Sequence, residues 1–201
     1  MAFATIDMTK GITGTIPVAN GGTGLASGTT GQFLKFTGTT TLASAADNGK
    51  VGQVIQNVIT SGNTASTTTT FIATSHEVVI TPSATSSNVF LIFSFQQGTQ
   101  TNNRYARFRL YRDIGGAGYS HLSNGVDGQP HEQGGTYKAS ASGQLTGPCT
   151  IQFYDDPNTT SACTYKVYMS LQDTTGTVNI YGEANSYGYA TAMEVLAWYK
   201  I

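Results

Sequence analysis

Charged side chains are scarce in this chain of 201 residues. Asp, Glu, Lys and Arg make up only 10% of it, against roughly a quarter of an average soluble protein. The formal net charge is −1, so no excess of either sign indicates nucleic acid or an anionic membrane as a partner. The missing polarity is supplied by Thr, Ser, Asn and Gln, and 24 residues are glycine.

Long apolar runs are also missing. No stretch approaches the ~20 apolar residues that a membrane-spanning helix needs. Residues 1–10, MAFATIDMTK, lack the basic start and the apolar core of a signal peptide. We therefore expect a soluble protein without membrane insertion, made in a cytoplasm.

Cysteine is equally rare, since Cys149 and Cys163 are the only two. Two cysteines do not make a disulfide framework. They flank the turn at 156–158 (DPN), and a hairpin closing there would place them roughly opposite each other, close enough to bridge. A reducing cytoplasm keeps thiols reduced, so we expect two buried free cysteines.

The familiar patterns of catalysis and metal binding are absent as well. The segment GKV at 49–51 lacks the hydroxyl of a phosphate loop, and GYSHL at 118–122 lacks the second glycine of a nucleophile elbow. The adjacent carboxylates Asp155 and Asp156 adjoin a turn and need not converge on one substrate, as glycosidase acids do. The three histidines show no metal-ligand spacing. We expect no enzyme, no cofactor and no metal.

What the chain does contain, from Val51 onward, is a dense series of strand signals. The 11 Tyr and 9 Phe, with many Val, Ile and Thr, suit the pleated, half-buried surface of a sheet. Turn residues separate the runs, and no segment has a convincing helical pattern. We predict an all-β fold, an antiparallel β-sandwich or jelly roll. The expected strands are 51–60, 68–73, 76–81, 88–96, 104–112, 149–154, 164–172, 177–182 and 190–198.

Residues 1–50 differ from the head domain predicted for 51–201. They hold scattered apolar residues, glycine at short intervals, and one short strand signal at 32–36 (QFLKF). Such a region buries too little apolar area to fold alone. We predict an extended Gly/Thr-rich arm that attaches to a larger particle or winds around copies of itself.

The four arginines all lie in the predicted strand 104–112. Alternation turns the side chains of Ala106, Phe108 and Leu110 to one face. The other face carries Tyr105, Arg107, Arg109 and Tyr111. This second face fits an anionic glycan, because arginine grips carboxylate or phosphate and aromatic rings stack on sugars. The interpretation that we favour is ion pairing with carboxylates of a neighbouring subunit, at Asp155, Asp156 or Glu183.

Two tyrosine-bearing segments are further candidates for surface contact. The long polar run at 115–146 carries Tyr119, His121 and His131, and a loop of that length is usually functional or mobile. The late turn YGEANSYGY carries Tyr187 and Tyr189. Tyr, Ser, Gly and Asn make adaptable recognition surfaces at low entropic cost. Merely solvated loops fit the same composition.

The arm also contains PVANGGTG at 17–24, with three glycines in four positions. Glycine lets a backbone turn sharply or approach another closely, which suits an arm that docks. The segment resembles a recurring motif of tail-fibre and related virion proteins of marine and freshwater bacteriophages. The residues expected to attach the arm are Pro17, Val18, Asn20, Gly21, Gly22 and Gly24.

The rest of the chain resembles a C-terminal domain of those same proteins. The matching segments come in order along the chain: GKVGQVIQ at 49–56, VVITPSATSSNVFLIFSF at 78–95, FRLYRD at 108–113, IQFYDDPNTTSACTYKVYMS at 151–170 and TAMEVLAW at 191–198. The resemblance implies a homotrimeric virion appendage with a jelly-roll head of the tumour-necrosis-factor-like type.

Two roles on the virion surface follow from this resemblance. One is a tail fibre that recognises a host-surface glycan. The other is a capsid head fibre or decoration protein, anchored by its N-terminal arm. The expected partners are two further copies and other virion proteins, and we expect the last strand, with Met193, Val195 and Ala197, to lie near the trimer axis.

Overall fold

A computed structural model describes residues 25, 28–39, 41–45, 50–99, 104–122, 134–138, 145–172, 175–182 and 187–196. The chain divides into two compact units, residues 1–49 and 50–201. In these described ranges every regular element is a β-strand, and none of them holds a helix that could span a membrane. The six attachment candidates at 17–24 lie outside the described residues.

The described part of the first unit contains a small hairpin. Strands β1 (Phe33–Phe36) and β2 (Leu42–Ala45) pair antiparallel, and the strand predicted at 32–36 is thereby confirmed. The apolar side chains of β1 stay exposed, with Phe33 at 63% and Phe36 at 64%. An isolated two-stranded hairpin is marginally stable at best, so we expect these side chains to pack against a partner surface.

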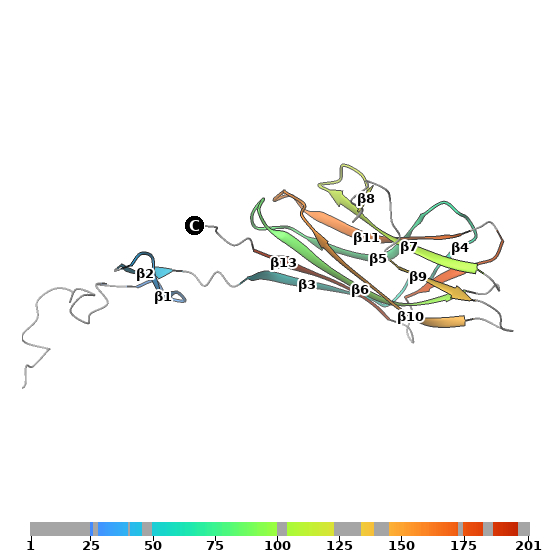
Figure 1. Cartoon of the computed structure of the whole chain (residues 1–201), viewed down its shortest axis with the longest axis horizontal. Coiled ribbons are helices and arrows are strands. Elements are labelled where there is room, and N and C mark those ends of the chain that lie inside the picture. The colour runs from blue at the N-terminus through green and yellow to red at the C-terminus, as the bar shows by residue number, and fades with distance from the viewer. Residues whose placement is uncertain are drawn as a thin grey trace, which may run out of the picture. The chain divides into compact units, whose positions relative to one another are not determined.

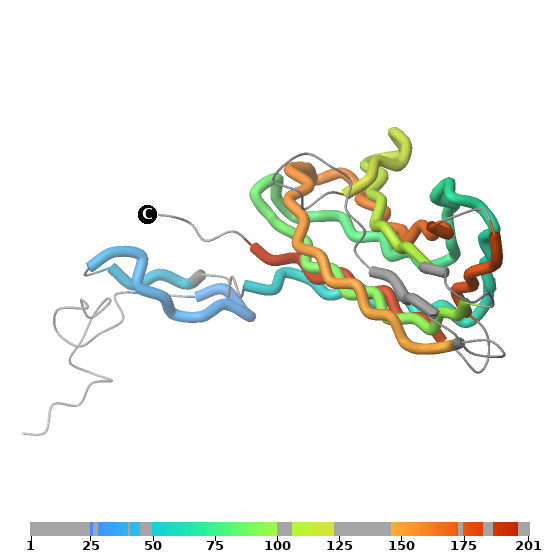
Figure 2. The backbone as a smooth tube through the Cα atoms, turned by 45° about the vertical axis from the view of Figure 1, so that its right-hand side comes forward, coloured from blue at the N-terminus to red at the C-terminus, as the bar shows by residue number. Residues whose placement is uncertain are grey.

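The second unit is a sandwich of two antiparallel sheets (Figures 1 and 2). The β6 sheet contains β3 (Val51–Ile59), β4 (Thr64–Ser66), β6 (Asn88–Thr99), β10 (Leu145–Asp155), β12 (Val178–Tyr181) and β13 (Gly188–Val195). The β11 sheet contains β5 (Ile72–Ile80), β7 (Arg104–Ile114), β8 (Ser120–His121), β9 (Gly134–Lys138) and β11 (Cys163–Leu171). The predicted all-β antiparallel sandwich is confirmed.

The connectivity is that of a jelly roll. The β6 sheet runs β3-β13-β6-β10, and the β11 sheet runs β5-β11-β7-β8. After β4 the chain crosses between the sheets at most steps, and of the described strands of this unit only β7 and β8 are neighbours in sequence that pair. Strands β12 and β13 share one edge of β6, end to end, and β10 takes the other edge.

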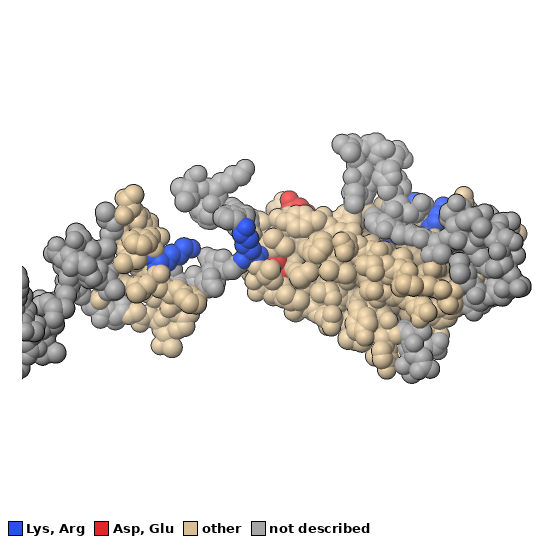
Figure 3. Space-filling model, turned by 60° about the horizontal axis from the view of Figure 1, so that its bottom comes forward, with Lys and Arg blue, Asp and Glu red and all other residues tan. Residues whose placement is uncertain are grey.

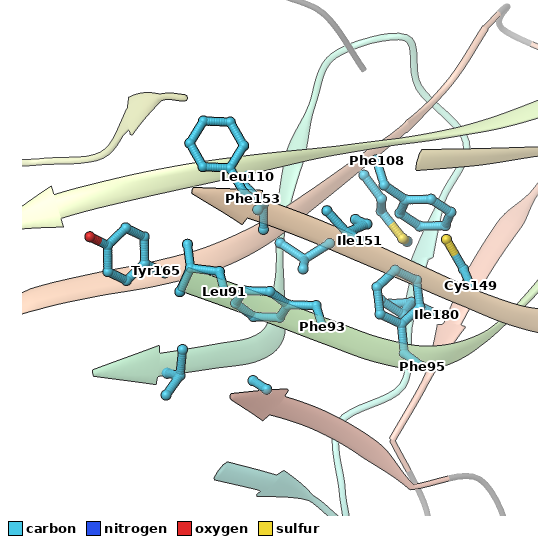
Figure 4. Packing of buried hydrophobic residues seen from close by; sticks show 14 of the residues in the cluster. Leu91, Phe93, Phe95, Phe108, Leu110, Cys149, Ile151, Phe153, Tyr165 and Ile180 are labelled. Atoms are coloured by element: carbon cyan, nitrogen blue, oxygen red, sulfur yellow. The ribbon is translucent and has the colours of Figure 1, made fainter. Parts of the chain in front are cut away.

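The core lies between the two sheets and follows from strict alternation. On β6 every second side chain from Val89 to Phe95 is at most 3% exposed, while the intervening ones are half-buried. On β7, Ala106, Phe108 and Leu110 are fully buried, as predicted. The Phe95 and Phe108 rings meet edge to face across the sandwich, with centroids 5.0 Å apart (Figure 4).

The hairpin predicted around 156–158 is wrong. Strand β10 pairs with β6, whereas β11 pairs with β5 and β7 in the opposite sheet. Cys149 therefore lies opposite Phe95, and Cys163 lies opposite Ile80 and Ile114. Both cysteines are buried and free, as expected. Because both strands have an apolar side, β10 and β11 bury these sides against each other across the core, which requires them to lie in opposite sheets.

The strands predicted at 68–73 and 76–81 are replaced by one continuous strand, β5. The polar residues Thr74 and Ser75 at its centre predicted a break between two strands. Thr74 is buried and its Oγ1 donates a hydrogen bond of 2.8 Å to the carbonyl of Val167, where the β5–β11 register shifts. This bulge keeps a hydroxyl satisfied inside the sheet.

The run at 115–146 is less of a loop than predicted. It contains β8 and β9, which both pair with β7, and β10 begins within it at Leu145. These short strands of Ser, His, Gly and Thr carry no apolar alternation that a sequence analysis could use.

Candidate functional site

Four aromatic side chains gather on the outer face of the β11 sheet. This tyrosine cluster consists of Tyr111, Tyr119, His121 and Tyr168. Alternation turns Tyr111 of β7 and Tyr168 of β11 away from the core, and pairing of β7 with β8 sets His121 opposite Tyr111. Three strands of the same sheet thus build the cluster.

The rings of the tyrosine cluster contact one another. Tyr111 and Tyr168 have centroids 4.0 Å apart at an interplanar angle of 30°. His121 meets Tyr111 edge to face at 5.4 Å, and Tyr119 lies 5.8 Å from Tyr168. Tyr119 is 37% exposed, and the other three rings are half-buried. Mutual packing of this kind fixes the orientation of each ring.

A glycine turn delivers Tyr119 to the cluster. Gly115, Gly116 and Gly118 have φ values of 62°, 83° and 106°, a region that L side chains rarely adopt. The backbone N–H of Gly118 donates to Asp113 Oδ1 at 2.9 Å, which ties the turn to the end of β7. The turn between β7 and β8 is therefore defined by these glycines.

An ion pair borders the cluster. Lys166 Nζ lies 2.6 Å from Glu77 Oε2 and 5.2 Å from the centroid of Tyr119. Burial lowers the pKa of Lys166, but the hydrogen bond and charge of Glu77 outweigh this effect and the pKa is raised. Burial also raises the pKa of Tyr168. The ammonium and the carboxylate largely cancel each other's charge at this edge.

The arginines of β7 face the same side but point to other partners. Arg107 Nη2 donates to the carbonyls of Thr69 and Leu171. The Arg109 guanidinium lies over the Phe71 ring at 4.1 Å, and that of Arg107 at 5.5 Å. The prediction that Arg107, Arg109 and Tyr111 share one strand face is confirmed. The arginines contact Phe71, however, whereas Tyr111 contacts Tyr168.

Ion pairing of Arg112 takes place within the chain. Its Nη1 lies 2.9 and 2.7 Å from the two oxygens of Asp155, and the Tyr165 hydroxyl donates to the same carboxylate at 2.7 Å. Burial lowers the pKa of Arg112, but Asp155 outweighs it and the pKa is raised. The favoured interpretation of pairing between subunits is therefore wrong for Arg112, because its carboxylate lies in its own core.

The remaining predicted contact residues are not in this cluster. Tyr189 lies on β13 in the β6 sheet, and Tyr187 lies just before this strand. The side chains of Tyr105 and His131, and the carboxylate of Glu183, lie outside the described residues. Sequence reasoning missed Glu77, Lys166 and Tyr168, although alternation in TYKVYMS turns the last two to one face.

The β6 sheet presents a second surface, which we call the uncharged face (Figure 3). A row of apolar side chains crosses four of its strands, β10, β6, β13 and β3, in register: Tyr154, Phe90, Met193 and Val54. Val54 is 55% exposed and Tyr154 57%. Val195 and Val51 pair beside this row, and Val51 is 53% exposed.

Charge is missing from this face altogether in the described strands. The outward positions of β3, β6, β10 and β13 include Val51, Val54, Gln56, Val58, Asn88, Phe90, Ile92, Ser94, Gln96, Gly98, Thr146, Pro148, Thr150, Gln152, Tyr154, Tyr189, Thr191, Met193 and Val195. Glu194 is only 1% exposed and accepts hydrogen bonds from Ser83 and Gln53. The two faces of the sandwich thus differ sharply in charge.

The described residues contain no group of three or more His, Cys, Asp or Glu side chains that could hold a metal ion. The groups that make up the candidate site are aromatic rings, hydroxyl groups and one ion pair.

No protein-family model matches the chain, and no curated protein matches it. Among solved structures it is similar to Eiger TNF from S. frugiperda, with 9% identity over 74% of this chain and 97% of that one, at a TM-score of 0.38. It is also similar to the infectious bursal disease virus Gt strain structure, with 10% identity, 81% and 42% coverage, and a TM-score of 0.39. The VP2 subviral particle of the same virus gives 9% identity at a TM-score of 0.39. The chain spans 42% of the length of these viral chains.

Proposed function

We propose that the chain is a surface protein of a bacteriophage virion, a homotrimeric fibre of the tail-fibre type. Its arm attaches to other virion proteins and its sandwich projects outward. The observation that carries the proposal is the uncharged face, with Val54, Met193, Phe90 and Tyr154 in one row. The sequence resemblance to phage appendage proteins supplies the class of particle and the number of copies.

The uncharged face has the composition of a protein interface. Interface cores are depleted in charge and enriched in aromatic residues and Met. Contiguous exposed apolar surface on a soluble protein marks an interaction site. The charged outward positions of the described sandwich lie on the other sheet, at Glu77, Lys166, Arg107, Arg109 and Asp113. We therefore assign the β6 sheet to contacts between copies and the β11 sheet to solvent.

Host-surface recognition then belongs to the β11 sheet, where the tyrosine cluster lies. Weak contacts repeated over three subunits and many appendages add up by avidity, without any single tight site. The exposed β1 side chains Phe33, Leu34 and Phe36 provide an apolar surface with which the arm binds the particle.

A capsid head fibre or decoration protein is the second candidate. The exposed hairpin of the first unit supports it equally, because a capsid lattice and a tail offer comparable partners. Imaging of labelled virions distinguishes the two. Full-length protein that blocks adsorption supports the fibre, whereas deletion that weakens particles without reducing adsorption supports decoration.

The first prediction tests the uncharged face by inserting charge. Val54→Asp places a carboxylate in the row, and we expect the full-length chain to change from trimer to monomer by light scattering after gel filtration. Val79→Asp is the matched control, because Val79 is 47% exposed on β5 of the other sheet. We expect this variant to stay trimeric.

Circular dichroism shows whether both variants keep their strand content. A folded Val54→Asp variant that remains trimeric, or a monomeric wild type, contradicts the assignment of this face.

A further inference from the structure

We propose that the tyrosine cluster, together with the Lys166–Glu77 pair, binds a neutral saccharide. The inference rests on the proposed role in host-surface recognition and names its ligand class. It departs from the anionic glycan expected on the arginine strand.

The rings supply the stacking surface. A pyranose has an apolar face of C–H bonds whose partial positive charge is attracted to the negative face of an aromatic ring. Tyr119 is the most exposed ring, and Tyr111 and Tyr168 hold each other at 4.0 Å beside it. Because the rings are already ordered by mutual contact, a ligand loses little side-chain entropy on binding.

The ion pair supplies hydrogen bonds suited to hydroxyls. Lys166 Nζ donates and the Glu77 carboxylate accepts, and they lie 2.6 Å apart with side-chain exposures of 20% and 38%. A sugar hydroxyl both donates and accepts, so adjacent hydroxyls can use both partners at once. The Lys166 ammonium also lies 5.2 Å from the Tyr119 centroid, which places the polar groups beside the stacking surface.

The balance of charge favours a neutral ligand. Lys166 is compensated by Glu77, and Asp113 adds a negative charge at the end of the same turn. The guanidiniums of Arg107 and Arg109 contact Phe71 and backbone carbonyls instead. A carboxylate or sulfate on the sugar would meet Glu77 and Asp113, whereas the guanidinium of Arg109, which neighbours Tyr168 in register, lies over Phe71.

A peptide partner is the competing class. Protein interfaces centre on a dry apolar patch, and the molecule carries such a patch on its other sheet. Here charged groups stand directly beside the rings, which is the mixture of stacking and hydrogen bonding that a hydroxyl-rich ligand uses. We therefore favour the saccharide.

The test uses the full-length chain on an array of neutral and acidic bacterial oligosaccharides, followed by calorimetry with the best ligand. We expect a neutral oligosaccharide to bind, and Tyr119→Ala and Tyr168→Ala to weaken it at least tenfold. Arg109→Gln is the matched control on the same sheet face and should leave binding unchanged.

Three results would overturn the inference. They are binding of acidic sugars alone with loss in Arg109→Gln, neutral binding that survives Tyr119→Ala, and binding of no glycan at all. Light scattering on the same samples reports the trimer separately, so failure of the sugar site is distinguishable from failure of the proposed appendage role.

Discussion

At the scale of single residues, His76 is a titratable group that the fold holds in an apolar site. It is fully buried between the sheets, where its ring meets Phe95 edge to face at 5.3 Å. A Cβ at position 188 would come within 2.3 Å of His76 Nε2, so only Gly188 leaves room for the ring. Burial disfavours the imidazolium and lowers the pKa of His76 to about 4.

His76 predicts a loss of stability in mild acid. Its pKa is 6.5 in the unfolded chain and about 4 in the folded one, so between these values the unfolded state binds the proton and the folded state does not. The free energy of unfolding therefore falls as pH drops from 6.5 to 4, by at most about 3 kcal/mol per subunit. Denaturant midpoints at fixed protein concentration measure it.

His76→Phe keeps a ring against Phe95 but cannot be protonated, so its midpoint should change less over this window. An unchanged slope in the variant contradicts the prediction.

Glu194 affects stability at lower pH than His76 does. Burial raises its pKa, but hydrogen bonds from Ser83, Gln53 and Ser87 outweigh this and lower it to about 2. Its stabilisation is lost as pH falls from 4.5 towards 2, and His76→Phe should leave that loss intact.

The candidate site shows at the residue scale what could be foreseen. Alternation along β7 correctly grouped Arg107, Arg109 and Tyr111, because side-chain direction is a local property of a strand. It gave no account of Phe71 or Tyr168, which reach the same face through pairing of distant segments. Such partners depend on topology, and no local pattern encodes them.

At the scale of elements, the strand interiors were predictable and their partners were not. The runs at 88–96 and 104–112 lie within β6 and β7, because the first is an almost continuous apolar run and the second alternates apolar residues with arginine. The assumption that strands adjacent in sequence pair with each other failed for β10 and β11. In a jelly roll the short connection at 156–162, between β10 and β11, crosses from one sheet to the other.

That crossing predicts unreactive thiols. Cys149 and Cys163 are each held in a different sheet, and burial raises the pKa of both, to about 11 for Cys149. Because the thiolate is the reactive form, we expect almost no reaction with Ellman's reagent in the native protein. Two thiols per chain should react after denaturation in guanidinium. Rapid reaction of the native protein would contradict this prediction. So would the absence of free thiol after unfolding without reductant, because the two cysteines would then be bridged.

At the scale of the whole sandwich, the two sheets present different outer surfaces. One carries a row of uncharged apolar side chains from Tyr154 to Val54, and the other carries the tyrosine cluster, its ion pair and the arginines. In our proposal the first sheet meets other copies and the second meets a host saccharide. Both assignments depend on which way alternate side chains point, so a shift of one residue in register would turn either set of side chains into the core.

The uncharged face has a consequence for the effect of salt on the proposed trimer. Salt weakens contacts between exposed charges by screening them, and this face has none to screen among its described strands. We therefore expect subunit association to stay constant from millimolar to molar sodium chloride, and to strengthen in sulfate, which favours apolar burial. Sedimentation over that range measures it. In our proposal, an appendage joined in this way keeps its form when the water around it changes from fresh to marine.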